Sequence, residues 1–225
     1  MNASNALGRV PTPARERGRI APAKLAHVVL KSANKDRLVA FYKTLLEAEA
    51  TFGDNNATFL TYDEEHHRIA VIGIPGLGRN SRRRVGVDHI AFTYASLGDL
   101  LATYERLKAA GIRPVWTTHH GATLSFYYQD PDNNFCELQI DVFETPEELE
   151  AYFNSGDFNV NPVGVDFDPE DVLARYRNGE SRSTLLKRVT EGPHNPAAMP
   201  RAYLGTFHWL MFKVATLLGK QPGAG

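Results

Sequence analysis

The sequence predicts an α+β fold in which two β-α-β-β-β modules pair into one curved, eight-stranded sheet around a cleft. The first observation is an internal repeat, because one constant shift lays His27 on His89 and Leu38 on Leu100. The second is that each copy contains one stretch with helical apolar spacing, followed by short β-like runs separated by polar turns. One such module cannot close a barrel alone, whereas two of them can enclose a cleft.

Length and composition exclude several classes of protein. At 225 residues the chain can form one good core, or two small repeated lobes with an appendage. The formal charge of −1 does not favour nucleic acid or an anionic membrane as partner. The single cysteine, Cys136, rules out an intrachain disulfide and suits the reducing cytoplasm, where we expect the protein to act.

The N-terminal stretch, residues 1–22, is predicted to be a flexible arm. It is rich in arginine and proline, and it holds no apolar run of the kind that opens a secretory signal. Transit peptides share the arginine bias, but this stretch has no amphipathic apolar face. The arm interpretation is therefore preferred.

Residues 23–75 are predicted to form the first module. Its opening strand is the run LAHVV around His27. Its helix is predicted from apolar side chains spaced i, i+3, i+4, i+7 and i+8. The later strands include ATFLTYD and HRIAVIGI, and an exposed basic loop over residues 76–86 leads to the next module.

Residues 87–141 are predicted to form the second module. It opens with the run VDHIA around His89, and its helix follows Ser96 and Asp99, which suit the N-cap and N3 positions. The remaining strands are predicted as PVWTT, TLSFYYQ and FCELQID. Glu137 lies in the last of them.

Alternation along these strands predicts which side chains share a face. His27 and His89 occupy matching places in the two modules, and Tyr127 and Glu137 lie on neighbouring strands of the second. Cys136 is predicted to point away from Glu137. A cleft lined by these faces would hold two imidazoles, one carboxylate and one phenol.

His27, His89 and Glu137 are therefore candidate metal ligands. A lone histidine on a strand is usually a hydrogen-bonded structural residue, but two at matching repeat positions suit an ion held between two lobes. Glu137 lies in an apolar run, where a carboxylate is costly to bury unless a cation or strong donors meet it. Two imidazoles and one carboxylate form the facial triad of non-haem Fe(II) oxygenases, which leaves positions open for substrate and O₂.

These residues, with the closing run YYQDPDNNFCELQ, resemble the vicinal oxygen chelate superfamily over roughly residues 24–141. Within it the chain is most similar to type I extradiol ring-cleaving dioxygenases of the catechol 2,3-dioxygenase and 2,3-dihydroxybiphenyl dioxygenase kind, in a single-domain version. Asn133 stands where that family's turn usually has glycine, and asparagine tolerates the left-handed backbone.

The resemblance implies roles for further residues. Tyr127 would hydrogen-bond a substrate oxygen, and His67, the second histidine of HHRIAVI, would be the acid–base residue. One of His119 and His120 would be a pocket histidine, and the spacing leaves the choice between them open. The implied activity is Fe(II)-dependent extradiol cleavage of a catechol-type diol by O₂, with Mn(II) as an alternative metal.

Two other functions compete with this one. A glyoxalase-like, metal-dependent isomerase or lyase of the same superfamily resembles a four-ligand site, with a carboxylate on the last strand of the first module. HRIAVIGI offers no such carboxylate. A non-catalytic binding module of the antibiotic-sequestering kind would lack the complete triad, which the sequence supplies.

Residues 142–225 are predicted to form a mostly helical extension. Thr145 and Asp168 each precede Pro-Glu and are expected to cap helices, the second of which Gly179 can end. The run NVNPVGVDF is predicted to be a loop, and residues 183–189 a short helix. The apolar stretch 202–218 is too short and too interrupted for a membrane span. We expect it to bury surface in a homo-oligomer or to cover the cleft.

Overall fold

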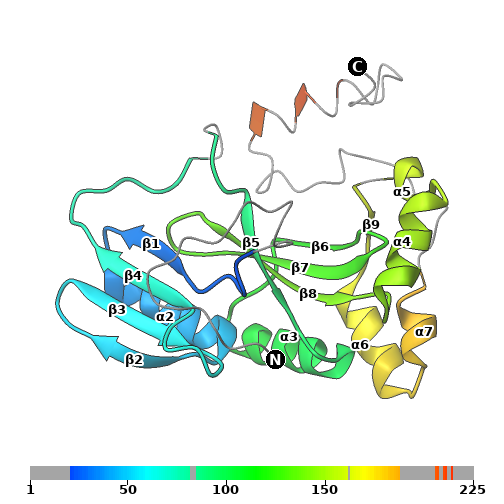
Figure 1. Ribbon diagram of the computed structural model, residues 1–225, viewed down its shortest axis with the longest axis horizontal. Coiled ribbons are helices and arrows are strands. Elements are labelled where there is room, and N and C mark those ends of the chain that lie inside the picture. The colour runs from blue at the N-terminus through cyan, green and yellow to red at the C-terminus, as the bar shows by residue number, and fades with distance from the viewer. Residues whose placement is uncertain are drawn as a thin grey trace, which may run out of the picture.

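The computed structural model describes residues 21–81, 85–161 and 163–187, together with five positions between 206 and 214 (Figure 1). The predicted N-terminal arm and the apolar stretch 202–218 lie almost entirely outside these residues. The division into arm, modules, linker and extension stays a prediction, as does the homo-oligomer. Among the described residues, no helix has the length and apolar character needed to cross a bilayer.

The first module is a four-stranded sheet with one helix, drawn in blue and cyan in Figure 1. Its strand order is β1-β4-β3-β2, with β1 parallel to β4 and the other pairs antiparallel. Its elements are β1 (Val28–Ser32), α2 (Lys35–Leu46), β2 (Glu49–Gly53), β3 (Ala57–Thr61) and β4 (Ile69–Gly73).

The second module repeats this topology and is drawn in green. Its order is β5-β8-β7-β6, again with its first and last strands in the chain, β5 and β8, parallel. The short strand β9 (Val165–Asp166) adds a fifth strand beside β6. The prediction of two β-α-β-β-β modules in an α+β fold is confirmed. Its elements are β5 (His89–Thr93), α3 (Leu97–Ala109), β6 (Trp116–His119), β7 (Thr123–Gln129) and β8 (Phe135–Asp141).

The expectation of one continuous sheet differs from the structure in one respect. The strands form two sheets, and no ladder joins β1 to β5 within the described residues. Residues 28–30 of β1 and residues 85–90, which lead into β5, line one pocket. The facing edges of the two sheets therefore border an opening.

One apolar core serves both modules. Leu38 and Tyr42 of α2 pack in the same buried cluster as Leu100 of α3 and Leu138 of β8. Burying a side chain of this size contributes about 2 kcal/mol. The Tyr42 hydroxyl also donates to Asp130 Oδ2 at 3.1 Å, which ties the first helix to the turn before β8.

The predicted helix caps are present. Ser96 accepts a hydrogen bond from the backbone N–H of Asp99 at the start of α3. Thr145 and Glu148 form a complete capping box at α4 (Pro146–Asn154). Such caps contribute about 1 kcal/mol each, so local sequence fixes where these helices begin.

The C-terminal extension lies against the outer edge of the second sheet, at the right of Figure 1. The loop predicted over residues 159–167 differs from the structure at two places. Residues 159–160 end helix α5, and Val165–Asp166 form β9, which pairs antiparallel with β6. The remaining elements are α5 (Asp157–Val160), β9 (Val165–Asp166), α6 (Pro169–Arg177) and α7 (Arg182–Leu185).

Candidate active site

A row of side chains crosses the second sheet on the face opposite its helix. The register sets Trp116 opposite Tyr127, and Tyr127 opposite Glu137. Cys136 belongs to the core between sheet and helices, whereas Trp116 and Tyr127 form a separate small cluster with Phe135. The prediction that Cys136 points away from Glu137 is confirmed.

Glu137, the carboxylate of this row, is buried, with 4% of its surface exposed. Its Oε1 accepts from the Tyr127 hydroxyl at 2.9 Å, and its Oε2 lies 2.9 Å from His89 Nε2. Burial raises the pKa of Glu137, but hydrogen bonds from His89, Ser125 and Tyr127 outweigh it and leave the pKa below its ordinary value. Glu137 is therefore held as a carboxylate.

His89, the first residue of β5, is held between two carboxylates. Its Nε2 faces Glu137, and its Nδ1 lies 2.8 Å from Asp88 Oδ2. The bond to Glu137, opposed by burial and assisted by Asp88, raises the pKa of His89. A carboxylate on Nδ1 fixes the ring orientation and aims Nε2 into the site, as outer carboxylates do for histidine ligands of metals.

His120 is the member of the histidine pair that joins this group. Its Nε2 lies 2.8 Å from the Tyr127 hydroxyl, and its Nδ1 lies 2.6 Å from the carbonyl oxygen of Val163. Burial lowers the pKa of His120, which favours the neutral ring near neutral pH. A continuous chain of contacts therefore runs from Val163 to Glu137.

His119 points elsewhere. Its Nδ1 accepts from the backbone N–H of Gly121 at 3.0 Å, and its Nε2 lies 2.8 Å from the carbonyl oxygen of Leu186. These contacts tie β6 to the end of α7. The structure thus separates the two histidines. His120, which follows the last residue of β6, contacts Tyr127, whereas His119 points to the other face of the strand, as successive side chains do.

The first module gathers a different histidine group. The ring of His67 lies 4.3 Å from that of His27 and 4.6 Å from that of Phe59, measured between centroids. His66 Nδ1 and His67 Nδ1 are 2.5 Å apart. Burial and the neighbouring imidazoles lower the pKa of His67, so its neutral form is favoured.

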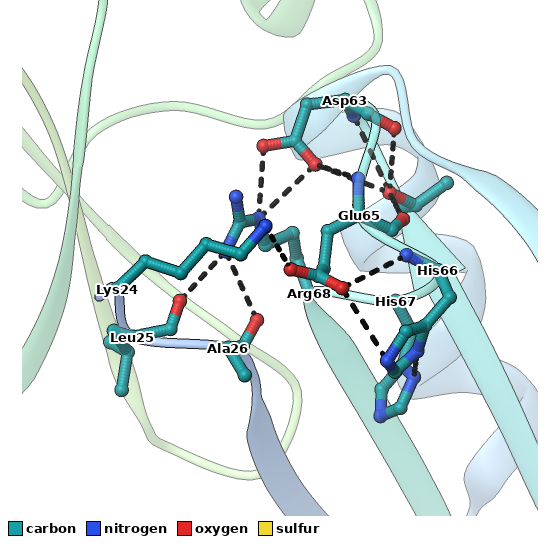
Figure 2. Close-up of polar contacts among 9 residues, drawn as sticks. Lys24, Leu25, Ala26, Asp63, Glu65, His66, His67 and Arg68 are labelled. Carbon is teal, nitrogen blue, oxygen red and sulfur yellow. Dashed lines mark hydrogen bonds and ion pairs between the residues drawn. The ribbon is translucent and has the colours of Figure 1, made fainter. Parts of the chain in front are cut away.

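His27 lies directly before β1, so its predicted place in the middle of a strand was wrong. Arg68 explains the late start of β1, because its Nη1 donates to the carbonyls of Leu25 at 2.7 Å and Ala26 at 3.1 Å (Figure 2). Asp63 holds the same guanidinium at 2.9 Å. A side chain thus takes the hydrogen bonds that a strand partner would otherwise supply.

The three predicted ligands are not all brought together. Over the described residues, no group of three or more His, Cys, Asp or Glu side chains could hold a metal ion. His89 and Glu137 do fit one, since their facing atoms are 2.9 Å apart. Adjacent ligands of an octahedral ion about 2.1 Å away would be separated by about 3 Å. His27 instead packs against His67.

Comparison with known proteins places the chain in a family. The sequence profile of the Glyoxalase/Bleomycin resistance protein/Dioxygenase superfamily matches residues 24–138. The chain belongs to this superfamily. The predicted resemblance is thereby confirmed, and the superfamily's extradiol dioxygenases are metal enzymes.

Two curated relatives come from Rhodococcus globerulus. Biphenyl-2,3-diol 1,2-dioxygenase 2 is 48% identical over 147 residues, which make up 65% of this chain and 77% of the relative. Biphenyl-2,3-diol 1,2-dioxygenase 3 is 40% identical over 168 residues, or 74% of this chain and 88% of the relative. A solved glyoxylase/bleomycin resistance protein/dioxygenase domain from Frankia is 21% identical and covers 54% of this chain and 99% of its own, with a TM-score of 0.46.

Two groups in the site were not predicted from the sequence. Asp88 stands directly before His89 in VDHIA, so a carboxylate beside a candidate ligand was a usable signal. The Val163 carbonyl carries no such signal, because every residue supplies one. Only the pairing of β9 with β6 brings it to His120.

Proposed function

We propose that this protein is an Fe(II)-dependent extradiol dioxygenase that cleaves a catechol-type aromatic diol with O₂. The observation that carries the proposal is the position of Glu137 between His89 and Tyr127. A carboxylate from Glu137, an imidazole from His89 and a phenol from Tyr127 thus meet at one point of the second sheet. The likeness to two biphenyl-2,3-diol dioxygenases supports the same conclusion.

His27, His89 and Glu137 are the proposed metal ligands. His89 and Glu137 are already spaced as neighbouring ligands of one ion. Residues 28–30, which directly follow His27, line the same pocket as His89, and this supports His27 as the third. Ferrous iron held there would supply the redox chemistry by which O₂ reacts with the ring; Mn(II) accepts the same ligands.

The other residues are proposed to position the diol and to move protons. Tyr127 would donate to or accept from a diol oxygen, and His120 would hold the Tyr127 hydroxyl in place, since the two lie 2.8 Å apart. His67 would take a proton from the diol. Its ring lies next to that of His27, and its lowered pKa leaves it free to accept a proton near neutral pH.

The glyoxalase-like alternative requires a carboxylate on the last strand of the first module, and this protein has none there. In the first sheet Ala70 pairs with Val29, as Glu137 pairs with Ala91 in the second. Ala70 thus occupies the place where a four-ligand site would need an acidic residue. We accordingly choose aromatic diols as substrates, with biphenyl-2,3-diol first because the relatives' names specify it.

The test is anaerobic reconstitution of the full chain with Fe(II), followed by a panel of catechols in an oxygen electrode. We expect one iron per chain, O₂ uptake matched to diol consumed, and a yellow ring-cleavage product. A parallel Mn(II) sample identifies the active metal. Bound iron with no O₂ uptake on any diol would reject the proposal, and so would turnover of methylglyoxal hemithioacetal instead.

A further inference from the structure

The C-terminal extension returns to the active site along β6. Its strand β9 pairs Asp166 with Thr118 and Val165 with His119. The indole Nε1 of Trp116 donates to Asp166 Oδ1 at 2.7 Å, so the extension is also bonded to the row that contains Tyr127. This segment lies beyond residues 24–138, which the superfamily profile matches.

A tight turn precedes β9 and is held by one side chain. Asn161, with 4% of its surface exposed, bonds to both sides of Gly164. Its Nδ2 donates to the Gly164 carbonyl at 2.7 Å, and its Oδ1 accepts from the Gly164 N–H at 2.9 Å. Val163, which lies inside this turn and directly precedes Gly164, is therefore held in one orientation.

Gly164 is needed at this position for two reasons. Its φ of +111° lies in the region that residues with a side chain rarely adopt. A Cβ there would lie 2.7 Å from the carbonyl oxygen of His119 and 2.8 Å from Thr118 Oγ1. Any side chain would push the turn away from β6.

The turn places the carbonyl group of Val163 beside the active-site row. The oxygen of Val163 lies 2.6 Å from His120 Nδ1. A carbonyl only accepts, so Nδ1 carries the hydrogen, and in the neutral ring Nε2 keeps the lone pair. Nε2 lies 2.8 Å from the Tyr127 hydroxyl. The hydroxyl has a single proton, which it donates either to Glu137 Oε1, as in this structure, or to the lone pair on Nε2.

We propose that the Val163 carbonyl, held by the Asn161–Gly164 turn, is a positioning group that fixes the Nδ1–H tautomer of His120 and aims its Nε2 at Tyr127. The expected effect on turnover rests on the proposed dioxygenase function, whereas the assignment of the His120 tautomer does not. The C-terminal extension then contributes to the structure of the active site. Its residues act through His120 and touch no substrate.

The chain supplies a matched pair of variants. Gly164→Ala introduces the clash with β6. Gly156→Ala lies in the same extension at a similar φ of +85°, but its new Cβ would meet no atom within 4 Å. Both variants carry the same kind of backbone strain, and only the first displaces the Val163 carbonyl. Asn161→Ala releases the turn without a clash and serves as the second variant if Gly164→Ala does not fold.

The first readout is the tautomer of His120, measured on the full-length, iron-free chain by ¹⁵N–¹H correlation of the imidazole rings. The His120→Asn variant assigns its signals. We expect the Nδ1–H form in the wild-type protein and in Gly156→Ala. In Gly164→Ala and Asn161→Ala we expect the other tautomer or a mixture of both. An unchanged tautomer in both of these variants would overturn the proposal.

The second readout is turnover by the iron-loaded enzyme. Partners that orient a catalytic ring typically contribute 10- to 100-fold. We expect kcat to fall about 10-fold in Gly164→Ala relative to Gly156→Ala, with iron content unchanged. An equal kcat in the two variants would reject the catalytic consequence. If the wild-type protein cleaves no diol, the dioxygenase proposal fails while the tautomer result still stands.

Discussion

The two modules share a backbone and differ in the chemistry of one row of side chains. In each sheet the row crosses the last three strands of the module at matching registers and contains one aromatic pair in contact, tilted in the first module and stacked in the second. The ring centroids are 5.1 Å apart in the first module and 4.9 Å apart in the second. The first row is Phe52, Phe59 and Ala70, and the second is Trp116, Tyr127 and Glu137.

Coverage of the two rows also differs. Phe52 is 47% exposed, whereas Trp116 is 6% exposed because β9 and the turn before it lie against β6. A buried carboxylate is stable only when donors meet it, and Glu137 has three such partners. The comparison teaches that the repeat supplies the geometry, while a few polar side chains and the extension supply the chemistry. Converting each second-row residue to its first-row counterpart tests this directly.

The largest effect is expected for Glu137→Ala, which reproduces Ala70. The substitution removes a proposed ligand and leaves His89 without its main partner. We expect iron content and ring cleavage to be lost together, with kcat/KM falling by more than about 100-fold, the upper end of what outer-shell residues contribute. Iron analysis and O₂ uptake measure the two quantities.

The control for Glu137→Ala is Gln139→Ala, which changes the next residue on the same face of β8. The Gln139 side chain donates a hydrogen bond to Thr93 and is not one of the proposed metal ligands. Wild-type iron content in Glu137→Ala would show that the ion is held elsewhere. The second row would then not be what distinguishes the modules.

Tyr127→Phe reproduces Phe59 and should have the next largest effect. Phenylalanine keeps the stack on Trp116 but removes the hydroxyl between His120 and Glu137. We expect iron to be retained and kcat to fall about 100-fold, as when a proton-handling group is lost. Tyr128→Phe is the matched control, because the Tyr128 hydroxyl is buried on the opposite face and has no hydrogen-bond partner among the residues that the structure describes. Equal kcat values for the two variants would remove Tyr127 from the site.

Much of this arrangement could be predicted from the sequence. Apolar spacing predicted both module helices, and local capping residues such as Ser96 and Thr145 predicted where helices begin. Strand alternation placed Tyr127 and Glu137 on one face, since the period of two is independent of tertiary context. The left-handed conformation of Asn133, with φ +68°, also follows from a local preference.

The rest depended on contacts between distant segments. The start of β1 after His27 depends on Arg68, which lies far along the chain and binds the preceding carbonyls. The choice between His119 and His120 depends on where β6 begins its pairing with β7. Strand β9 has only two residues and no alternation to detect, so β6 and not local sequence determines it.

Trp116→Phe, which reproduces Phe52, should have the smallest effect of the three. Phenylalanine preserves an aromatic partner for Tyr127 but loses the bond from the indole Nε1 to Asp166. One such bond contributes about 1 kcal/mol, and we expect a loss of this size in the free energy of unfolding, measured with urea. Activity should stay within a few-fold of wild type, because Tyr127 stands between Trp116 and Glu137 in the register of the sheet. A loss of turnover as large as that of Tyr127→Phe would mean that burial by the extension, and not the polar identity of Tyr127 and Glu137, separates the active row from its inactive counterpart.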